Sequence, residues 1–202
     1  MKKWIILLIL FAVSLSLRAA NVIQADQEKA KQCVACHGAD GNSQQAMWPK
    51  IAGQNQKYLL KQLQDFKKGK AGGRYNAAME PIMANLTAQD LQDLAVFYAN
   101  QKGTIETAST DNLALGQRLY RGGDVKRGIV ACGACHGPDG SGNAEAGFPR
   151  LSGQHAAYVV KQLQDYRSGE RKNGVNNIMQ SIAMSMTDKD VQAVANYISG
   201  LH

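Results

Sequence analysis

The stretch "CGACH" at residues 132–136 decides what kind of fold this sequence can form. Two cysteines two residues apart, with a histidine directly after the second, are typical of three kinds of site: a zinc knuckle, a thiol redox centre, or the covalent attachment point of a haem. A near copy, "CVACH", occupies residues 33–37. Each of the three sites needs something different from the surrounding sequence, so the rest of the chain can separate them.

The sequence is duplicated over most of its length. "YLLKQLQDFKKG" at 58–69 matches "YVVKQLQDYRSG" at 158–169 at seven of twelve positions, with an offset of 100. "WPKIAGQ" at 48–54 matches "FPRLSGQ" at 148–154 with the same offset, and the two cysteine motifs are offset by 99. A single repeat of this length indicates a domain duplication, because solenoid repeats are much shorter.

We therefore expect four segments along the chain. Residues 1–20 begin with lysines, continue with an apolar run too short to span a bilayer and end in small residues, which is typical of a cleaved signal peptide. Residues 21–102 form the expected N-terminal domain and residues 112–202 the expected C-terminal domain. The polar stretch "GTIETASTD" at 103–111 is the expected linker between them. Export would place the protein in an oxidising compartment.

The charge of the chain is mild once the signal peptide is removed. The whole sequence has 23 basic and 16 acidic residues and a net charge of +7. Three of the basic residues and none of the acidic ones lie in residues 1–20, which leaves +4 for residues 21–202. This charge is too small to indicate nucleic-acid binding, and the sequence has no arginine-rich stripe. We therefore expect no nucleic-acid partner.

The periodicity of the apolar residues is helical in both halves. Leu59, Leu63 and Phe66 recur at the spacing of one helix face. A threonine followed three residues later by an aspartate, at 87–90 and again at 187–190, predicts the capped start of the last helix of each half. No sustained alternation predicts a strand, so we expect an all-α protein. Each half is too small to bury a large hydrophobic core, and we expect a further group to fill its interior.

Haem attachment explains the cysteines better than the alternatives do. A zinc ribbon usually brings its second cysteine pair within about 20 residues of the first, whereas here the two pairs lie 96 residues apart. A thioredoxin-like site needs a βαβ setting, which the helical pattern lacks. The sequence has no other cysteines to form a disulfide framework. We predict two covalently bound haem c groups, held by thioethers to Cys33, Cys36, Cys132 and Cys135.

The histidine that ends each motif is the predicted proximal ligand of the iron, His37 in the first half and His136 in the second. A ligating imidazole usually donates its other N–H to a backbone carbonyl. Pro49 and Pro149 recur 12 and 13 residues after these histidines. We predict that their carbonyls accept this hydrogen bond; the alternative is that they are ordinary loop prolines.

The duplication also selects the ligand on the opposite side of each iron. The two remaining histidines both lie in the second half and have no counterpart in the first. Methionine is the other common ligand, and at the offset of 100 only Met79 and Met179 pair with one another. We predict these two as the axial ligands, with Met83 and Met184 as the second choice.

Several polar residues also recur at the offset of 100. Their repetition makes them candidates for binding the haem propionates, although the lysines could equally belong to a solvated helix face. The recurring pairs are Gln54 with Gln154, Tyr58 with Tyr158, and Lys61 with Lys161.

The two CxxCH halves, the stretch "FPRLSGQHAAYVVKQLQDYRSGE" at 148–170 and the closing "NYISGLH" resemble the dihaem cytochrome c4 family. The resemblance implies two tandem class I cytochrome c domains related by a pseudo-twofold axis, with the haems near their interface and Met79 and Met179 as ligands. One departure concerns the first helix. Gly116, four residues before Tyr120, suits a close helix crossing in the second half, but Asp26 stands where the first half would have its glycine.

The resemblance further implies a periplasmic electron-transfer protein with no small-molecule substrate. Its expected donor is a quinol–cytochrome c reductase, its expected acceptor a terminal oxidase, and the family associates peripherally with the inner membrane. Because protein ligands fill both axial positions, we expect no enzyme activity. Two alternatives remain: a cytochrome subunit of a periplasmic dehydrogenase, and a haem enzyme such as a dihaem peroxidase, which would need an open iron.

Overall fold

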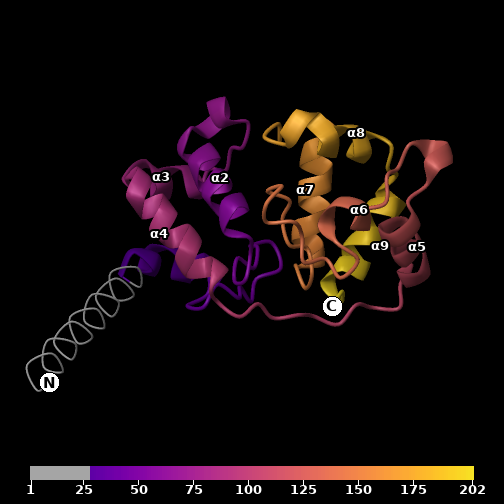
Figure 1. Ribbon diagram of the computed structural model, residues 1–202, viewed down its shortest axis with the longest axis horizontal. Coiled ribbons are helices and arrows are strands. Elements are labelled where there is room, and N and C mark those ends of the chain that lie inside the picture. The colour runs from indigo at the N-terminus through magenta and orange to yellow at the C-terminus, as the bar shows by residue number, and fades with distance from the viewer. Residues whose placement is uncertain (1–27) are drawn as a thin grey trace, which may run out of the picture.

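The computed structural model describes residues 28–202. The expected signal peptide, residues 1–20, and Asp26 lie outside the described residues. Between residues 28 and 202 the regular structure is helical, and the only β-type pairings are the isolated bridges of Asp124 with Ile129 and of Asn143 with Phe148. The predicted all-α class is therefore confirmed. Two halves lie side by side, joined by an extended segment along one edge (Figure 1).

The two halves contain the same order of helices with one difference. The N-terminal half has a helix at 28–37, α2 (Gln56–Lys67), a short 3-10 helix (Gly69–Gly72), α3 (Met79–Ala84) and α4 (Ala88–Ala99). The C-terminal half has α5 (Leu113–Gly122), α6 (Gly133–His136), α7 (Ala156–Ser168), α8 (Ile178–Met184) and α9 (Asp188–Ser199), with 3-10 helices at Val125–Arg127 and Val175–Asn177. The first cysteine motif ends one continuous helix, whereas a loop separates α5 from the second motif.

The predicted caps fix the start of the last helix in each half. At Thr87 the hydroxyl accepts from the backbone N–H of Asp90 at 3.2 Å, and the Asp90 carboxylate accepts from the backbone N–H of Thr87 at 2.8 Å. Thr187 and Asp190 form the same pair of bonds at the same two distances. Both free N–H groups at the helix start are thereby satisfied, which confirms the capping prediction.

Each half has its own hydrophobic core, built on one face of its last helix. The buried residues are Leu91, Leu94, Ala95 and Tyr98 on α4, and Val191, Val194, Ala195 and Ile198 on α9. The repeated sequence thus gives two separate cores of similar construction, and the interface between the halves is made by other residues.

Gly116 allows α5 to cross α9 at very short range. A Cβ atom at this position would lie only 2.1 Å from the carbonyl oxygen of Ala193, so no side chain fits there. Tyr120, one turn further on, is fully buried, and its hydroxyl donates to the carbonyl of Gly137 at 2.7 Å. The close crossing predicted for the second half is confirmed.

In the first half, the described part of the first helix contacts α4 through a buried alanine. Ala30, in the helix at 28–37, is buried in the core beside the α4 residues. The preceding Lys29 lies 2.8 Å from Asp90 and 2.6 Å from Asp93 on α4. A small residue and two ion pairs therefore hold the described part of this helix against α4, without a glycine.

The two halves meet in the middle of the molecule, where α2 faces α7 (Figure 1). The segment that joins them also contacts both halves. Glu106 of this segment lies 3.3 Å from Lys50 Nζ and 2.5 Å from His155 Nδ1. Between residues 28 and 202, no helix has the length and apolar character that crossing a membrane requires.

We predict that Gly116→Ala destabilises the protein by about 1–3 kcal/mol, because the new methyl group would force α5 away from α9. Gly122→Ala is the matched control, since it lies in the same helix and no atom lies within 4 Å of its Cβ position. Guanidinium denaturation of the haem-loaded protein, followed by far-ultraviolet circular dichroism, measures both. Equal stabilities of the two variants would contradict the close crossing.

Candidate haem sites

The histidine of each cysteine motif is held by a proline carbonyl. His37 ends the helix at 28–37, and its Nδ1 lies 2.8 Å from the carbonyl oxygen of Pro49. His136 ends α6, and its Nδ1 lies 3.0 Å from the carbonyl oxygen of Pro149. Because a carbonyl oxygen can only accept, Nδ1 must carry the proton in both rings.

This hydrogen bond leaves Nε2 of each imidazole as the atom that can bind a metal. Both rings are buried, and burial lowers the pKa of His37 and of His136 below the ordinary value, with the proline carbonyl opposing the shift. The neutral form is thus favoured, with its lone pair on Nε2. Nε2 of neither ring forms a hydrogen bond with any residue between 28 and 202.

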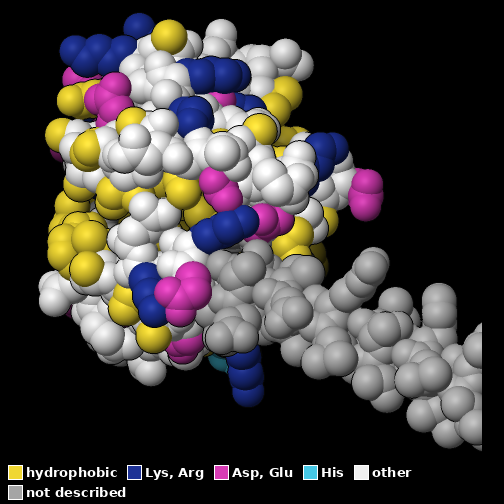
Figure 2. Space-filling model, turned by 90° about the vertical axis from the view of Figure 1, so that its left-hand side faces the viewer, with side chains coloured by type: hydrophobic (Ala, Val, Ile, Leu, Met, Phe, Trp, Pro, Cys, Tyr) yellow, Lys and Arg dark blue, Asp and Glu magenta, His cyan; other side chains and the backbone are white. Residues whose placement is uncertain are grey.

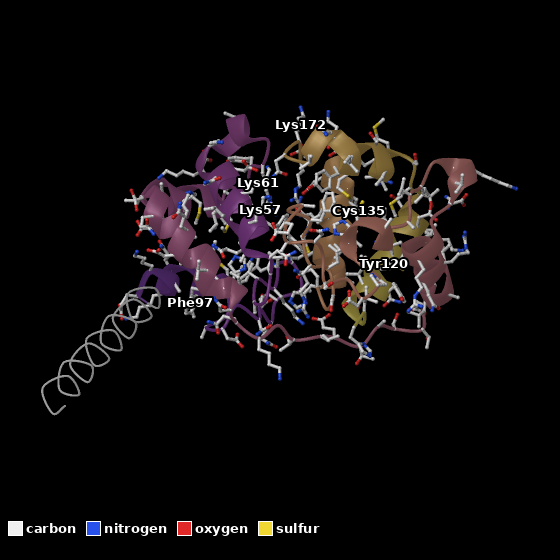
Figure 3. The ribbon with its side chains drawn as sticks, in the orientation of Figure 1. Lys57, Lys61, Phe97, Tyr120, Cys135 and Lys172 are labelled. Atoms are coloured by element: carbon white, nitrogen blue, oxygen red, sulfur yellow. The ribbon has the colours of Figure 1, made fainter. Side chains whose placement is uncertain are left out.

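The four cysteines are half-buried, and none of them forms a disulfide. Cys33 and Cys132, the first of each pair, pack against the hydrophobic cores of their halves. Burial raises the pKa of the Cys33 thiol and raises that of Cys132 to about 11. A reactive redox thiol needs a lowered pKa, so these environments disfavour a thiol redox centre. Cys135 lies within the C-terminal half, among its helices (Figure 3).

The two methionines selected by the repeat lie at equivalent places. Met79 is the first residue of α3 and Met179 the second residue of α8. Both are partly buried, and each packs against the same apolar cluster as the first cysteine of its own half. Each cluster therefore connects a thioether side chain with a cysteine of the attachment motif.

The other candidate ligands lie in unlike environments. Met83 is completely buried in the first core, whereas Met184 is 71% exposed. His155 is bound on both ring nitrogens, with Nε2 at 2.8 Å from the carbonyl of Ser43 and Nδ1 against the Glu106 carboxylate. These side chains do not recur in both halves as Met79 and Met179 do.

The donor set in each half fits a covalently attached haem. It consists of two thiols close together at the end of a helix, a neutral imidazole with Nε2 free, and a thioether side chain on the same apolar cluster. A haem would also supply the apolar volume that each small core lacks.

Two buried arginines hold the halves together at the interface. The Arg171 guanidinium donates to Tyr58 Oη at 3.0 Å and to Gln62 Oε1 at 3.1 Å, both on α2 of the other half. Arg74 donates to Tyr158 Oη at 2.7 Å in the opposite direction. Within the described residues neither arginine forms an ion pair with a carboxylate, so the acceptors of these two guanidinium groups are neutral.

The recurring polar residues suggested as propionate ligands all have protein partners. The two tyrosines accept from the arginines just described. Lys61 pairs with Asp65 at 2.5 Å and Lys161 with Asp165 at 2.8 Å along their own helices, as on a solvated helix face. Lys61 also donates to the carbonyl of Asn173 in the other half, at 2.9 Å. Figure 3 shows it on α2, in the middle of the molecule.

The two arginines were not identified from the sequence, because they are not separated by the 100-residue offset of the repeat. Arg74 and Arg171 are offset by 97 residues, and position 174 is a glycine. Arg74 lies five residues after Gly69 and Arg171 two residues after Gly169, so no common spacing in the sequence points to them. The repeat identified the tyrosines as constrained without revealing the arginines that contact them.

Comparison with known proteins gives a consistent result over the described chain. The cytochrome c family model matches twice, at residues 26–102 and 113–202. Cytochrome c4 of Pseudomonas aeruginosa is 50% identical over 185 residues, which cover 91% of this chain and 90% of that protein. A thiosulfate dehydrogenase electron acceptor of Stutzerimonas stutzeri is 38% identical, covering 85% of this chain and 80% of its own length.

The fold matches a solved structure as well. The crystal structure of reduced recombinant cytochrome c4 from Pseudomonas stutzeri is 46% identical to this chain and has a TM-score of 0.86. The match covers 89% of this chain and 98% of that one. The expected arrangement of two tandem cytochrome c domains is thereby confirmed, and with it the prediction of two covalently bound haem c groups.

We predict that Arg171→Gln weakens the contact between the domains, because it leaves Tyr58 Oη without its buried donor and removes one of the donors to Gln62 Oε1. The loss should be about 1–3 kcal/mol, which for a chain of this size lowers Tm by roughly 2–4 °C per kcal/mol. Lys172→Gln is the matched control: its side chain is exposed, and its backbone N–H keeps the 2.7 Å bond to Gly73. Calorimetry measures both, and equal Tm values would contradict the assignment.

Proposed function

The chain belongs to the cytochrome c4 family of dihaem electron-transfer proteins, and on that premise we propose that it carries electrons between respiratory complexes in the periplasm. The observation that carries the proposal is the duplicated donor set: both domains present a neutral histidine with Nε2 free and a methionine on the same apolar cluster as the first cysteine. Two equivalent closed sites suit storage or relay of electrons.

The axial ligands in this proposal are His37 with Met79 in the first domain and His136 with Met179 in the second. The thioether bonds are formed by Cys33 and Cys36, and by Cys132 and Cys135. When bound, each haem supplies an iron that accepts and releases one electron. The chain itself fixes the imidazole through the proline carbonyl, presents the methionine sulfur and excludes water with its apolar cluster.

Methionine ligation and burial both favour the reduced state. A thioether is a weaker donor than a second imidazole and raises the reduction potential. The ferric centre carries the extra positive charge, so an apolar cluster disfavours it. We therefore expect a potential suited to accepting electrons from a quinol-oxidising complex.

The proposed partners are proteins at the membrane surface. The donor is a quinol–cytochrome c reductase and the acceptor a terminal oxidase, with peripheral attachment at the periplasmic face of the inner membrane. On the outer side of the N-terminal domain, basic and acidic side chains are interspersed (Figure 2). Such a surface supports brief, salt-sensitive encounters, and we propose no nucleic-acid partner and no small-molecule substrate.

A second candidate function is supported by one relative. The thiosulfate dehydrogenase electron acceptor of Stutzerimonas stutzeri is similar over most of both chains. The same two haem sites would then accept electrons from a periplasmic dehydrogenase, and only the donor would differ. Catalysis by this chain itself, as in a dihaem peroxidase, is not proposed, because each domain provides a methionine for the position that such an enzyme needs open.

We predict that Met79→Ala and Met179→Ala each remove part of the weak absorption band near about 695 nm that methionine ligation gives ferric haem c. Each variant should lose the contribution of one haem while the Soret band persists. Met184→Ala is the control, because this side chain is 71% exposed and should leave the band intact. An unchanged band in Met79→Ala or Met179→Ala would refute that ligand for its domain.

We also predict that membranes containing a terminal oxidase oxidise the reduced protein, and that the rate falls as salt is added because the encounter is electrostatic. Stopped-flow absorbance measures the rate, and cyanide-treated membranes are the control. A purified thiosulfate dehydrogenase, mixed with the oxidised protein and thiosulfate, tests the second candidate. Rapid reduction there, with no oxidation by the membranes, would replace the first proposal with the second.

A further inference from the structure

Two buried glutamines reach across the interface and bind the backbone of the opposite domain. Gln154 Oε1 accepts from the backbone N–H of Lys50 at 2.9 Å, and its Nε2 donates to the carbonyl of Lys50 at 2.8 Å. Gln54 forms the same two bonds with Arg150, at 2.7 Å and 2.8 Å. Both side chains are 9% exposed or less. The reciprocal pairs are what a pseudo-twofold relation between the domains would produce.

The peptide group that each glutamine binds is the one that holds the proximal histidine of the opposite domain. The carbonyl of Pro49 and the N–H of Lys50 are two ends of a single peptide unit. His37 Nδ1 lies 2.8 Å from its oxygen, and Gln154 Oε1 lies 2.9 Å from its nitrogen. The second domain has the same series of hydrogen bonds. His136 Nδ1 lies 3.0 Å from the Pro149 oxygen, and the Arg150 nitrogen lies 2.7 Å from Gln54 Oε1.

Hydrogen bonds at the two ends of one peptide unit strengthen one another. When the N–H donates, electron density moves toward the carbonyl oxygen, which becomes a better acceptor. A better acceptor draws the Nδ1 proton of the histidine and makes Nε2 more basic. The glutamine of one domain therefore acts on the imidazole of the other, through one peptide unit and without touching the ring.

The orientation of each glutamine is fixed by its surroundings. Oε1 must face an N–H and Nε2 a carbonyl, so the amide cannot be reversed without losing both bonds. Oε1 also accepts from the backbone N–H of the next residue, Asn55 in the first domain at 2.9 Å and His155 in the second at 3.1 Å. A buried amide bound on both sides is well suited to hold a fixed dipole against the peptide unit.

We propose that Gln54 and Gln154 are positioning residues that set the reduction potential of the haem in the opposite domain, through the 149–150 and 49–50 peptide units. This inference rests on the axial ligation proposed above. A more basic Nε2 stabilises ferric iron, so each glutamine lowers the potential of the opposite haem. The interface then does more than join the domains, because the contact made by each glutamine alters the electron affinity of the haem in the opposite domain.

The test exchanges the two glutamines one at a time for methionine, which keeps the length and removes both hydrogen bonds. Gln154→Met should favour reduction of the haem held by His37 by about threefold, or about 28 mV at 59 mV per tenfold change for one electron. The haem in its own domain should stay unchanged. Gln54→Met should give the mirror result, with the shift at the haem held by His136. Potentiometric titration followed by nuclear magnetic resonance separates the two haems by their paramagnetically shifted methyl signals.

Asn55→Ala is the matched control. The Asn55 side chain donates to the carbonyl of Phe148 across the same interface at 2.7 Å, one residue before Pro149, and so it does not touch the 149–150 unit. Loss of this hydrogen bond should leave the reduction potentials of both haems unchanged. Equal shifts of both haems, a shift confined to the haem of the mutated domain, or a shift in Asn55→Ala as large as that in Gln54→Met would each overturn the proposal.

Hydrogen exchange gives a second measurement that does not depend on potentials. In the unaltered protein the amide protons of Lys50 and Arg150 should be protected, and Gln154→Met should release only that of Lys50. Rapid exchange of both in the unaltered protein would also overturn the inference. The band near about 695 nm, recorded on the same samples, separates the two proposals: its absence would refute the ligands, whereas a normal band with unmoved potentials would refute only the role of the glutamines.

Discussion

The hydrogen bond from each proximal histidine to a proline carbonyl is the contact on which the rest of the molecule depends. It fixes the tautomer of His37 and His136, and so decides which nitrogen faces a metal. It also ties the helix that bears the cysteines to a loop with no regular structure, and the other side of that loop forms the domain interface. One bond therefore connects ligand chemistry, domain folding and domain pairing.

The buried charge at the interface is related to the small size of the two hydrophobic cores. Two small domains leave little apolar surface for their contact, and much of the contact is made by polar side chains. Arg171 and Arg74 are buried there against tyrosine and glutamine oxygens. Burying a cation without a carboxylate is costly unless its hydrogen bonds are well satisfied. That arrangement is reasonable in a protein whose cofactors carry carboxylates of their own.

The sequence was sufficient for features that depend on one domain alone. The capped helix starts and the close crossing at Gly116 were both predicted, because each involves only residues of its own domain. The contacts between the two domains could not be predicted from the sequence. Gln54 and Gln154 are a recurring pair in the sequence and are candidates for binding the haem propionates, but their contacts to the opposite domain are not visible there. Repetition shows that a position is constrained, but it does not show which atoms of the other domain it touches.

A duplicated protein can gain a property that neither half has alone only where one half contacts the other. Most residues of such an interface could vary freely if they served adhesion alone, and several here differ between the halves: Asn55 binds the backbone near Phe148, whereas His155 binds that of Ser43. The glutamine bonds to the 49–50 and 149–150 units are reciprocal in both directions. The interface keeps its symmetry at the peptide units behind both histidines and loses it one residue away, so each haem site receives the same contact from the opposite domain, as the proposed effect on both haems requires.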